Sequence, residues 1–189
     1  LMLYCGLRPG EVCALQWKDI DFTDECVIVD KALKKDGSIG LPKTESGIRI
    51  VPIPRDFLVL LQERKGSPFD LVCPQLNGKY HTHSSRVKMW KSICRKMNIA
   101  MGCRVFRNQL MPPFPLSDDF TMYNLRHTYC TDLEKSGVPI NIARRLMGHA
   151  SIETTSNIYT HDSKESFEIA KNLINNKNSS GKTLGKQSV

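Results

Sequence analysis

Apolar and polar positions follow two different periods along this chain of 189 residues. The apolar run LMLY and the following GLRPGEVCALQW read as two helices, the second starting near Pro9, because proline suits a first helical turn. Between residues 26 and 53, β-branched residues and strict alternation take over, and KKDGSIG reads as a turn. This part of the pattern predicts a small antiparallel sheet.

Helical spacing returns after residue 54 and dominates the rest of the chain. We expect helices over 55–65, 84–97, 121–135 and 140–147, a short segment over 151–159, and a last helix over 163–175. Prolines make the stretch MPPFPLSDDF a loop, and residues 177–189 read as a flexible polar tail. The expected fold class is therefore mainly α with a small antiparallel β-sheet (α+β).

The helix expected over 84–97 carries an apolar face and a basic one. The apolar positions, which we expect to be buried, are Val87, Trp90, Ile93, Cys94 and Met97. The basic positions lie elsewhere around the helix and could run along phosphate groups.

Composition narrows the function classes. Apolar residues make up 40% and charged residues 24%, which is typical of a soluble globular protein, and no apolar run approaches the roughly 20 residues of a membrane helix. Seven cysteines without a C-x-x-C pair indicate reduced thiols, and the lone His81-x-His83 pair lacks further ligands, so we expect no metal site. A net charge of +8 indicates a polyanionic partner, with nucleic acid first.

Four clusters contain residues suited to phosphate chemistry. They are Arg8 at a helix corner, Lys43 on a hairpin, Arg126 with His127 on a helix, and His149 with Tyr159 around a turn. An arginine can hold two phosphate oxygens through its planar fork, and two such forks offset the charge that develops in a transition state. A tyrosine nearby becomes a nucleophile where positive charge favours its phenolate.

The ordered series GLRPGE, PKTESGIR, LRHT, LMGH and IYTH resembles the catalytic domain of the tyrosine recombinases, the phage-integrase family, and especially integrases of conjugative transposons. The resemblance covers nearly the whole chain. It implies that residues 1–176 form a catalytic domain without the family's amino-terminal core-binding and arm-binding domains. It further implies site-specific cleavage and rejoining of DNA, for excision or integration of a mobile element, without metal, ATP or another cofactor.

The resemblance also implies a role for each motif residue. Arg8 and Arg126 would clamp the scissile phosphate, and Glu11 would support Arg8. The remaining roles are protonation of the departing 5′ oxygen by Lys43, a hydrogen bond to the phosphate from His149, and nucleophilic attack by Tyr159 to give a 3′-phosphotyrosyl link.

One position departs from the family pattern. Tyr123 stands three residues before Arg126, where the family usually has histidine. A phenol can donate a hydrogen bond to phosphate but carries no charge at neutral pH, so we expect a positioning role. His127 points about 100° away from Arg126 on a helix, which indicates packing or support of the site rather than phosphate contact. Tyr123 and Tyr129 are rival nucleophiles to Tyr159.

The resemblance implies partners as well. We expect double-stranded DNA as substrate and a dimer to tetramer on DNA, in which the helix over 163–175 docks on a neighbouring protomer. Such a protein would act in the prokaryotic cytoplasm, on the nucleoid. A membrane partner is not expected.

Other interpretations remain open at this point. Arg126 could form a structural ion pair with Asp132 or Glu134, and His149 could cap a helix. The stretch GVPINIARRLMGHASIETTSNIY also fits a helix-turn-helix DNA reader without catalysis. Within catalysis, a type IB topoisomerase uses the same chemistry.

Overall fold

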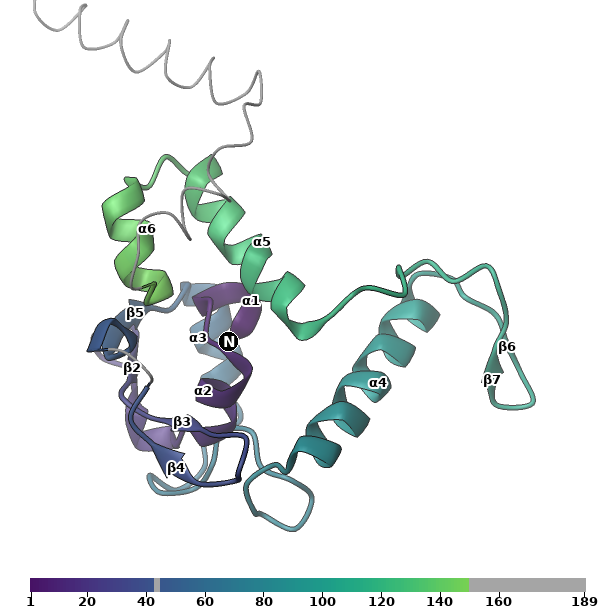
Figure 1. The fold of residues 1–189 in the computed structure, drawn as a ribbon, viewed down its shortest axis with the longest axis horizontal. Coiled ribbons are helices and arrows are strands. Elements are labelled where there is room, and N and C mark those ends of the chain that lie inside the picture. Colours follow the sequence, from purple (N-terminus) through teal and green to yellow (C-terminus); the bar gives the residue numbers. More distant parts are fainter. Residues whose placement is uncertain (43–44, 150–189) are drawn as a thin grey trace, which may run out of the picture.

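The structure is a computed structural model that describes residues 1–42 and 45–149 (Figure 1). Lys43 and Tyr159, the segment expected over 151–159, the helix expected over 163–175 and the tail over 177–189 lie outside the described residues. No helix within the described ranges is long and apolar enough to cross a membrane.

Two short helices form the corner that carries Arg8. Helix α1 (Met2–Cys5) ends at Gly6, whose φ of 63° lies in the left-handed region, and α2 (Pro9–Ala14) begins two residues after Leu7. Arg8 is the N-cap residue of α2, and its backbone N–H donates to Glu11 Oε2 at 2.7 Å. Glu11 thus satisfies a backbone donor that the first turn of a helix leaves unpaired.

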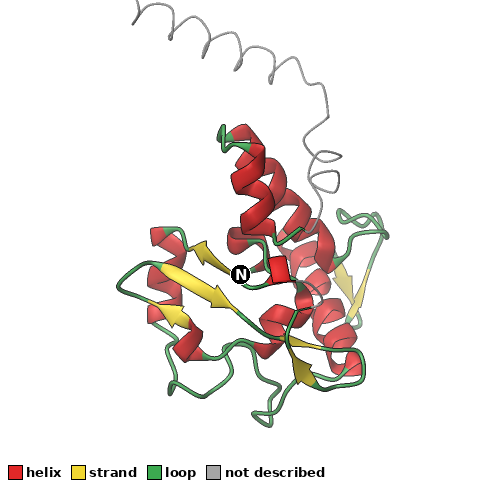
Figure 2. Cartoon of the chain, turned by 60° about the vertical axis from the view of Figure 1, so that its left-hand side comes forward, coloured by secondary structure: helices red, strands yellow, loops and turns green. Residues whose placement is uncertain are grey.

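A three-stranded antiparallel sheet lies beside these helices in the order β1-β2-β5. Its strands are β1 (Ile20–Asp21), β2 (Cys26–Val29) and β5 (Arg49–Pro52). A side hairpin consists of β3 (Ala32–Leu33) and β4 (Ile39–Gly40), and 3₁₀ turns precede β1 (Trp17–Asp19) and β5 (Glu45–Gly47). The antiparallel sheet expected over 26–53 is confirmed, and Figure 2 shows its strands in yellow.

Strand β5 turns a charged residue inward. Val51 and Ile53 are buried in the core, whereas Ile50 is 63% exposed on the other face. Because alternate side chains of a strand share a face, Arg49 points inward with Val51 and Ile53 and is only 8% exposed. An arginine in that place requires partners inside the protein.

The middle of the chain departs from the expected packing. Helix α3 (Arg55–Gln62) precedes a long loop, and α4 (His83–Ala100) leads to a hairpin of β6 (Val105–Phe106) and β7 (Gln109–Leu110) that the sequence pattern did not predict. In Figure 1, α4 stands to one side of the other helices and the hairpin projects beyond it.

The expectation of a buried apolar face on α4 is wrong. Val87 and Ile93 remain 39% and 38% exposed, because the helix lies beside the main body rather than on it. Trp90 instead stacks on Phe120, with ring centroids 5.5 Å apart, so the loop before the next helix covers part of α4.

The last described helices are α5 (Met122–Lys135) and α6 (Ile140–Met147), as the sequence predicts. Helix α5 packs against α1 and α6, and α6 packs against β5. Gly148 ends α6 with a φ of 63°, a conformation that glycine adopts without steric cost. One core therefore joins segments from both ends of the described chain, including Cys5, Val51, Tyr129 and Met147.

We expect Gly6→Ala to destabilise the protein. An added Cβ would lie 2.2 Å from Tyr129 Cδ1, and the left-handed backbone disfavours alanine as well. The loss of unfolding free energy should be about 3 kcal/mol, measured by urea denaturation. Gly37→Ala is the matched control, because Gly37 also has positive φ but has nothing within 4 Å of the added carbon. Equal losses in the two variants would contradict a packing constraint at Gly6.

Candidate active site

Three arginines converge on the carboxyl end of α6. Each donates a hydrogen bond to one of three consecutive carbonyl oxygens, which the helix itself leaves unpaired and which form the negative end of its dipole. The pairs are Arg49 Nε with Leu146 O at 2.7 Å, Arg126 Nη2 with Met147 O, and Arg8 Nη2 with Gly148 O at 2.7 Å. The arginines come from β5, α5 and the start of α2, so one helix end brings three distant segments together.

Glu11 is the carboxylate that holds two of these arginines. Its side chain is 2% exposed and contacts Arg49 through both oxygens, at 3.0 Å from Nη1 and 2.8 Å from Nη2. Arg8 Nη1 donates to the same carboxylate at 2.9 Å. Burial alone raises the pKa of Glu11, but the hydrogen bonds and charges of Arg49 and Arg8 outweigh it and lower the pKa. Glu11 therefore carries its negative charge at neutral pH.

Arg126 is almost fully buried beneath the site. It is 4% exposed and donates to the carbonyl oxygens of Gly6 and Met147. Burial, and then the nearby charge of Arg8, lower the pKa of Arg126 to about 9. The side chain is still a cation at neutral pH, and the interpretation that it pairs with Asp132 or Glu134 is wrong, because its described partners are the two carbonyls.

His149 follows directly on Gly148, and its backbone N–H donates to Arg144 O at 3.1 Å. This bond completes the turn that ends α6, so the helix-cap interpretation holds for the backbone of His149. Burial, and then the charges of Arg126, Arg8 and Arg49, lower the pKa of the imidazole to about 4. His149 is thus neutral at physiological pH and can offer a hydrogen bond without adding charge.

The cluster as a whole is suited to an anion. Within residues 1–42 and 45–149, Arg8 and Arg49 contact the carboxylate of Glu11, and Arg126 adds a third guanidinium group that contacts only backbone carbonyls. The Arg8 side chain is 34% exposed, so this fork can meet a ligand from solvent. A phosphate group, with several oxygens and a diffuse negative charge, is the ligand that paired guanidinium forks match.

The structure thus brings together four of the predicted site residues, Arg8, Glu11, Arg126 and His149. Tyr123 and His127 lie on α5 with exposed side chains, so packing does not explain His127. The charge of His127 is close enough to affect His149. Lys43 and Tyr159 lie outside the described residues.

Tyr129 is not available for nucleophilic attack. It is 8% exposed and lies against Gly6 in the core, where burial raises the pKa of its hydroxyl. A protonated phenol in that place packs the corner that carries Arg8.

Arg49 is the site residue that sequence reasoning missed. In the sequence, Arg49 is one of several basic residues in and near the expected sheet. The available signal was its place in GIRIVPIP, where the alternation puts Arg49 on the same face as Val51 and Ile53.

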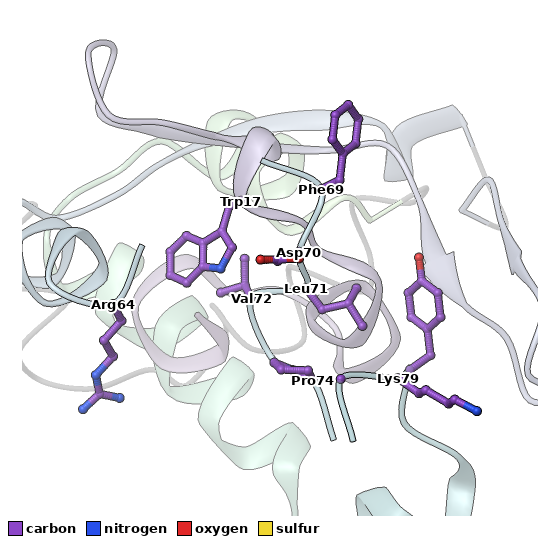
Figure 3. A pocket seen from close by; sticks show the side chains of 10 residues that line it. Trp17, Arg64, Phe69, Asp70, Leu71, Val72, Pro74 and Lys79 are labelled. Atoms are coloured by element: carbon purple, nitrogen blue, oxygen red, sulfur yellow. The ribbon is translucent and has the colours of Figure 1, made fainter. Parts of the chain in front are cut away.

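An open hollow of about 920 Å³ lies elsewhere on the molecule (Figure 3). Trp17, Phe69, Leu71 and Lys79 are among its lining residues, and none of the clustered arginines takes part. This hollow and the arginine cluster are therefore separate features. No group of His, Cys, Asp and Glu suited to a metal ion occurs among the described residues.

Comparison with known proteins decides the family. The family model described as "Phage integrase family" matches residues 1–166. The chain belongs to the phage integrase family.

Individual members show similar stretches of sequence. A tyrosine recombinase of Thermosipho africanus is 31% identical over 180 residues, which cover 92% of this chain and 52% of that protein. The ICEBs1 integrase of Bacillus subtilis is 30% identical over 162 residues, with 82% and 42% covered. The transposase from transposon Tn916 of Enterococcus faecalis is 29% identical, with 85% and 40% covered. This chain spans about half the length of the curated relatives it matches or less.

Solved integrase structures share the fold. The integrase of transposon Tn1549 (residues 82–397), in complex with circular intermediate DNA, matches with a TM-score of 0.69 and 26% identity, covering 92% of this chain and 57% of that one. The XerA recombinase matches with a TM-score of 0.61 at 20% identity, covering 91% and 53%. The expected α+β fold class is confirmed by these neighbours and by the described elements.

The lowered pKa of His149 predicts a pH dependence of stability. Between about pH 6.5, the ordinary pKa of histidine in an unfolded chain, and about pH 4, the unfolded state binds a proton that the folded state does not. The stability contributed by neutral His149 should therefore be lost as the pH falls through this window. Wild type should lose more unfolding free energy than His149→Gln between these pH values, measured by urea denaturation. Parallel curves would contradict a neutral His149.

Proposed function

We propose that this integrase-family chain cleaves and rejoins DNA through Tyr159, for excision or integration of a mobile element. The arginine cluster at the end of α6 carries the proposal, because it gathers two phosphate-binding forks and a neutral histidine at one place. Relatives named integrase and transposase supply the biological setting.

In the proposed step, the phenol of Tyr159 releases its proton to water, and its oxygen attacks the scissile phosphorus and forms a phosphotyrosyl bond to the 3′ side. The bond from phosphorus to the 5′ oxygen breaks, and Lys43 gives that oxygen its proton. Arg8 and Arg126 hold the non-bridging oxygens as charge develops, and His149 donates a hydrogen bond. Attack by a different 5′ hydroxyl reverses the step and completes strand exchange.

Double-stranded DNA is the proposed substrate. The Tn1549 integrase structures are complexes with transposon DNA. In this chain, α4 presents the exposed side chains of Lys88, Lys91 and Lys96, and exposed lysines suit contacts with a phosphate backbone.

The finer organisation belongs to the same proposal. Residues 1–176 act as the catalytic domain, in which Tyr123 helps to position the phosphate and His127 supports the site. The helix expected over 163–175 docks on a neighbouring protomer in a dimer or tetramer on DNA, in the cytoplasm on the nucleoid.

A helix-turn-helix reader without catalysis has no specific support. Such a protein needs basic residues on its surface, but it gives no reason for Arg126 to be buried beside Arg8 and Glu11. Burying a guanidinium group costs free energy, and a phosphate clamp would explain why the fold keeps Arg126 there.

We expect Tyr159→Phe to abolish covalent attachment to DNA while DNA binding persists. The hydroxyl is the atom that forms the new bond, whereas binding rests on many backbone contacts. A nicked suicide duplex with the element's end sequence should give a protein–DNA adduct in a denaturing gel with wild type and with Tyr80→Phe, a control outside the arginine cluster. An adduct with Tyr159→Phe would show that another residue is the nucleophile, and Tyr123 would be the next candidate.

Arg126→Ala should slow cleavage by about 10³-fold and weaken DNA binding only a few-fold, because the clamp matters most in the transition state. Single-turnover cleavage and gel-shift titration separate the two effects. Since Arg126 also holds two carbonyls, a thermal melt must show that the variant is folded. Arg55→Ala serves as a surface control, because the side chain of Arg55 is 84% exposed and pairs with Glu25 rather than with a residue of the cluster. Equal losses of rate and affinity in Arg126→Ala would argue against a transition-state role.

A further inference from the structure

We infer that Arg49 is a positioning residue that neutralises Glu11 and so leaves the charge of Arg8 for the scissile phosphate. The inference rests on the proposed function and concerns the same site. It adds a third arginine, which does not itself meet the substrate.

The hydrogen bonds of Arg49 are directed into the protein. Of its five N–H groups, Nε–H donates to Leu146 O at 2.7 Å, two donate to the oxygens of Glu11, and one donates to Gly47 O at 3.0 Å. Its side chain is 5% exposed. With four of its five donors used, Arg49 has one N–H group left and cannot grip a phosphate as a fork.

Arg8 has the opposite arrangement. Within the described residues, its side chain donates once to Glu11 and once to Gly148 O, so three of its five N–H groups are left for a ligand. Its side chain is 34% exposed. Arg8 is therefore the arginine that can bind a phosphate, and Arg49 is the arginine that holds Glu11 in place.

Charge explains why a second arginine is needed on Glu11. If Arg8 alone faced the buried carboxylate, the pair would be neutral and Arg8 would attract an anion only weakly. Arg49 contacts both oxygens of Glu11, at 3.0 and 2.8 Å, and offsets its charge. Glu11 can then orient Arg8 without cancelling its charge.

Packing fixes Arg49 directly behind the binding surface. A Cβ added to Gly148 would lie 3.0 Å from Arg49 Nη1, so this guanidinium group lies against the residue whose carbonyl accepts from Arg8. Arg49 also joins Gly47, on the turn that follows Lys43, to the end of α6. It is placed to set the position of Arg8 and of this turn together.

The test compares Arg49→Met, Arg49→Lys and the double variant Arg49→Met with Glu11→Gln. Inorganic phosphate is the first probe, and its effect on the melting temperature reports anion binding without any need for cleavage. Single-turnover formation of the covalent adduct on the suicide duplex is the second readout. Arg55→Met is the matched control, since Arg55 is an arginine paired with a carboxylate on the surface.

If Arg49 acts by neutralising Glu11, the variants should differ in their phosphate-induced shift of the melting temperature in a particular order. Arg49→Met should lose most of the phosphate-induced shift and form adduct roughly 10- to 100-fold more slowly. Removing the charge of Glu11 in that background should restore the phosphate shift and at least part of the rate. Arg49→Lys should melt at a lower temperature but keep the phosphate shift, because lysine still neutralises Glu11 while losing the bonds to the carbonyls.

A merely structural Arg49 predicts a different result. The phosphate shift would then follow the melting temperature in all variants, and Glu11→Gln would restore nothing. That result overturns the inference, as does a full phosphate shift in Arg49→Met. If Arg49→Met does not fold, Arg49→Lys decides the question by keeping or losing the shift. Absence of adduct with wild type, together with the predicted order of phosphate shifts, would refute the proposed cleavage but support the role of Arg49.

Discussion

The end of helix α6 is the constraint on which the site depends. A helix leaves its last carbonyl groups without partners inside the helix, and here three of them accept hydrogen bonds from Arg49, Arg126 and Arg8. The partners come from β5, α5 and the start of α2, so the helix end fixes segments that are far apart in the sequence. The left-handed turn at Gly148 then carries His149 to the same place. The arrangement of the site residues and the packing of distant segments thus rest on the same hydrogen bonds.

Electrostatics complete the design of the site. Guanidinium groups in close contact repel one another, and the buried carboxylate of Glu11 and the negative end of the α6 dipole offset that repulsion. Burial is the largest cause that lowers the pKa of His149 to about 4, and the remaining positive charge of the arginines lowers it further. A phosphate would supply the negative charge that this arrangement leaves unmatched. Under the proposed function, the site is thus organised for a phosphate in advance, as electrostatic catalysis requires.

Sequence predicted the elements whose signals are local and missed the relations set by distant partners. Pro9, Pro139 and Gly148 mark helix ends directly, and the helices beginning near Pro9 and spanning 140–147 follow from them. The partners of Arg126 could not be read in this way, because Gly6 and Met147 are remote in sequence and offer backbone carbonyls, which every residue type has. Arg49 was overlooked because a buried arginine needs a buried partner, and only the fold brings Glu11 to it. The apolar face of α4 was predicted from helical periodicity, but periodicity does not say whether another segment covers such a face, and part of it is exposed.

The most direct measurement is a crystal structure of the full chain covalently trapped on a suicide DNA substrate. The account predicts that the phosphorus is bonded to the oxygen of Tyr159, and that Arg8 and Arg126 each donate to its non-bridging oxygens while Arg49 remains on Glu11 and Leu146. A trapped phosphate that lies away from the end of α6, with Arg8 and Arg126 making no contact to it, would contradict the account.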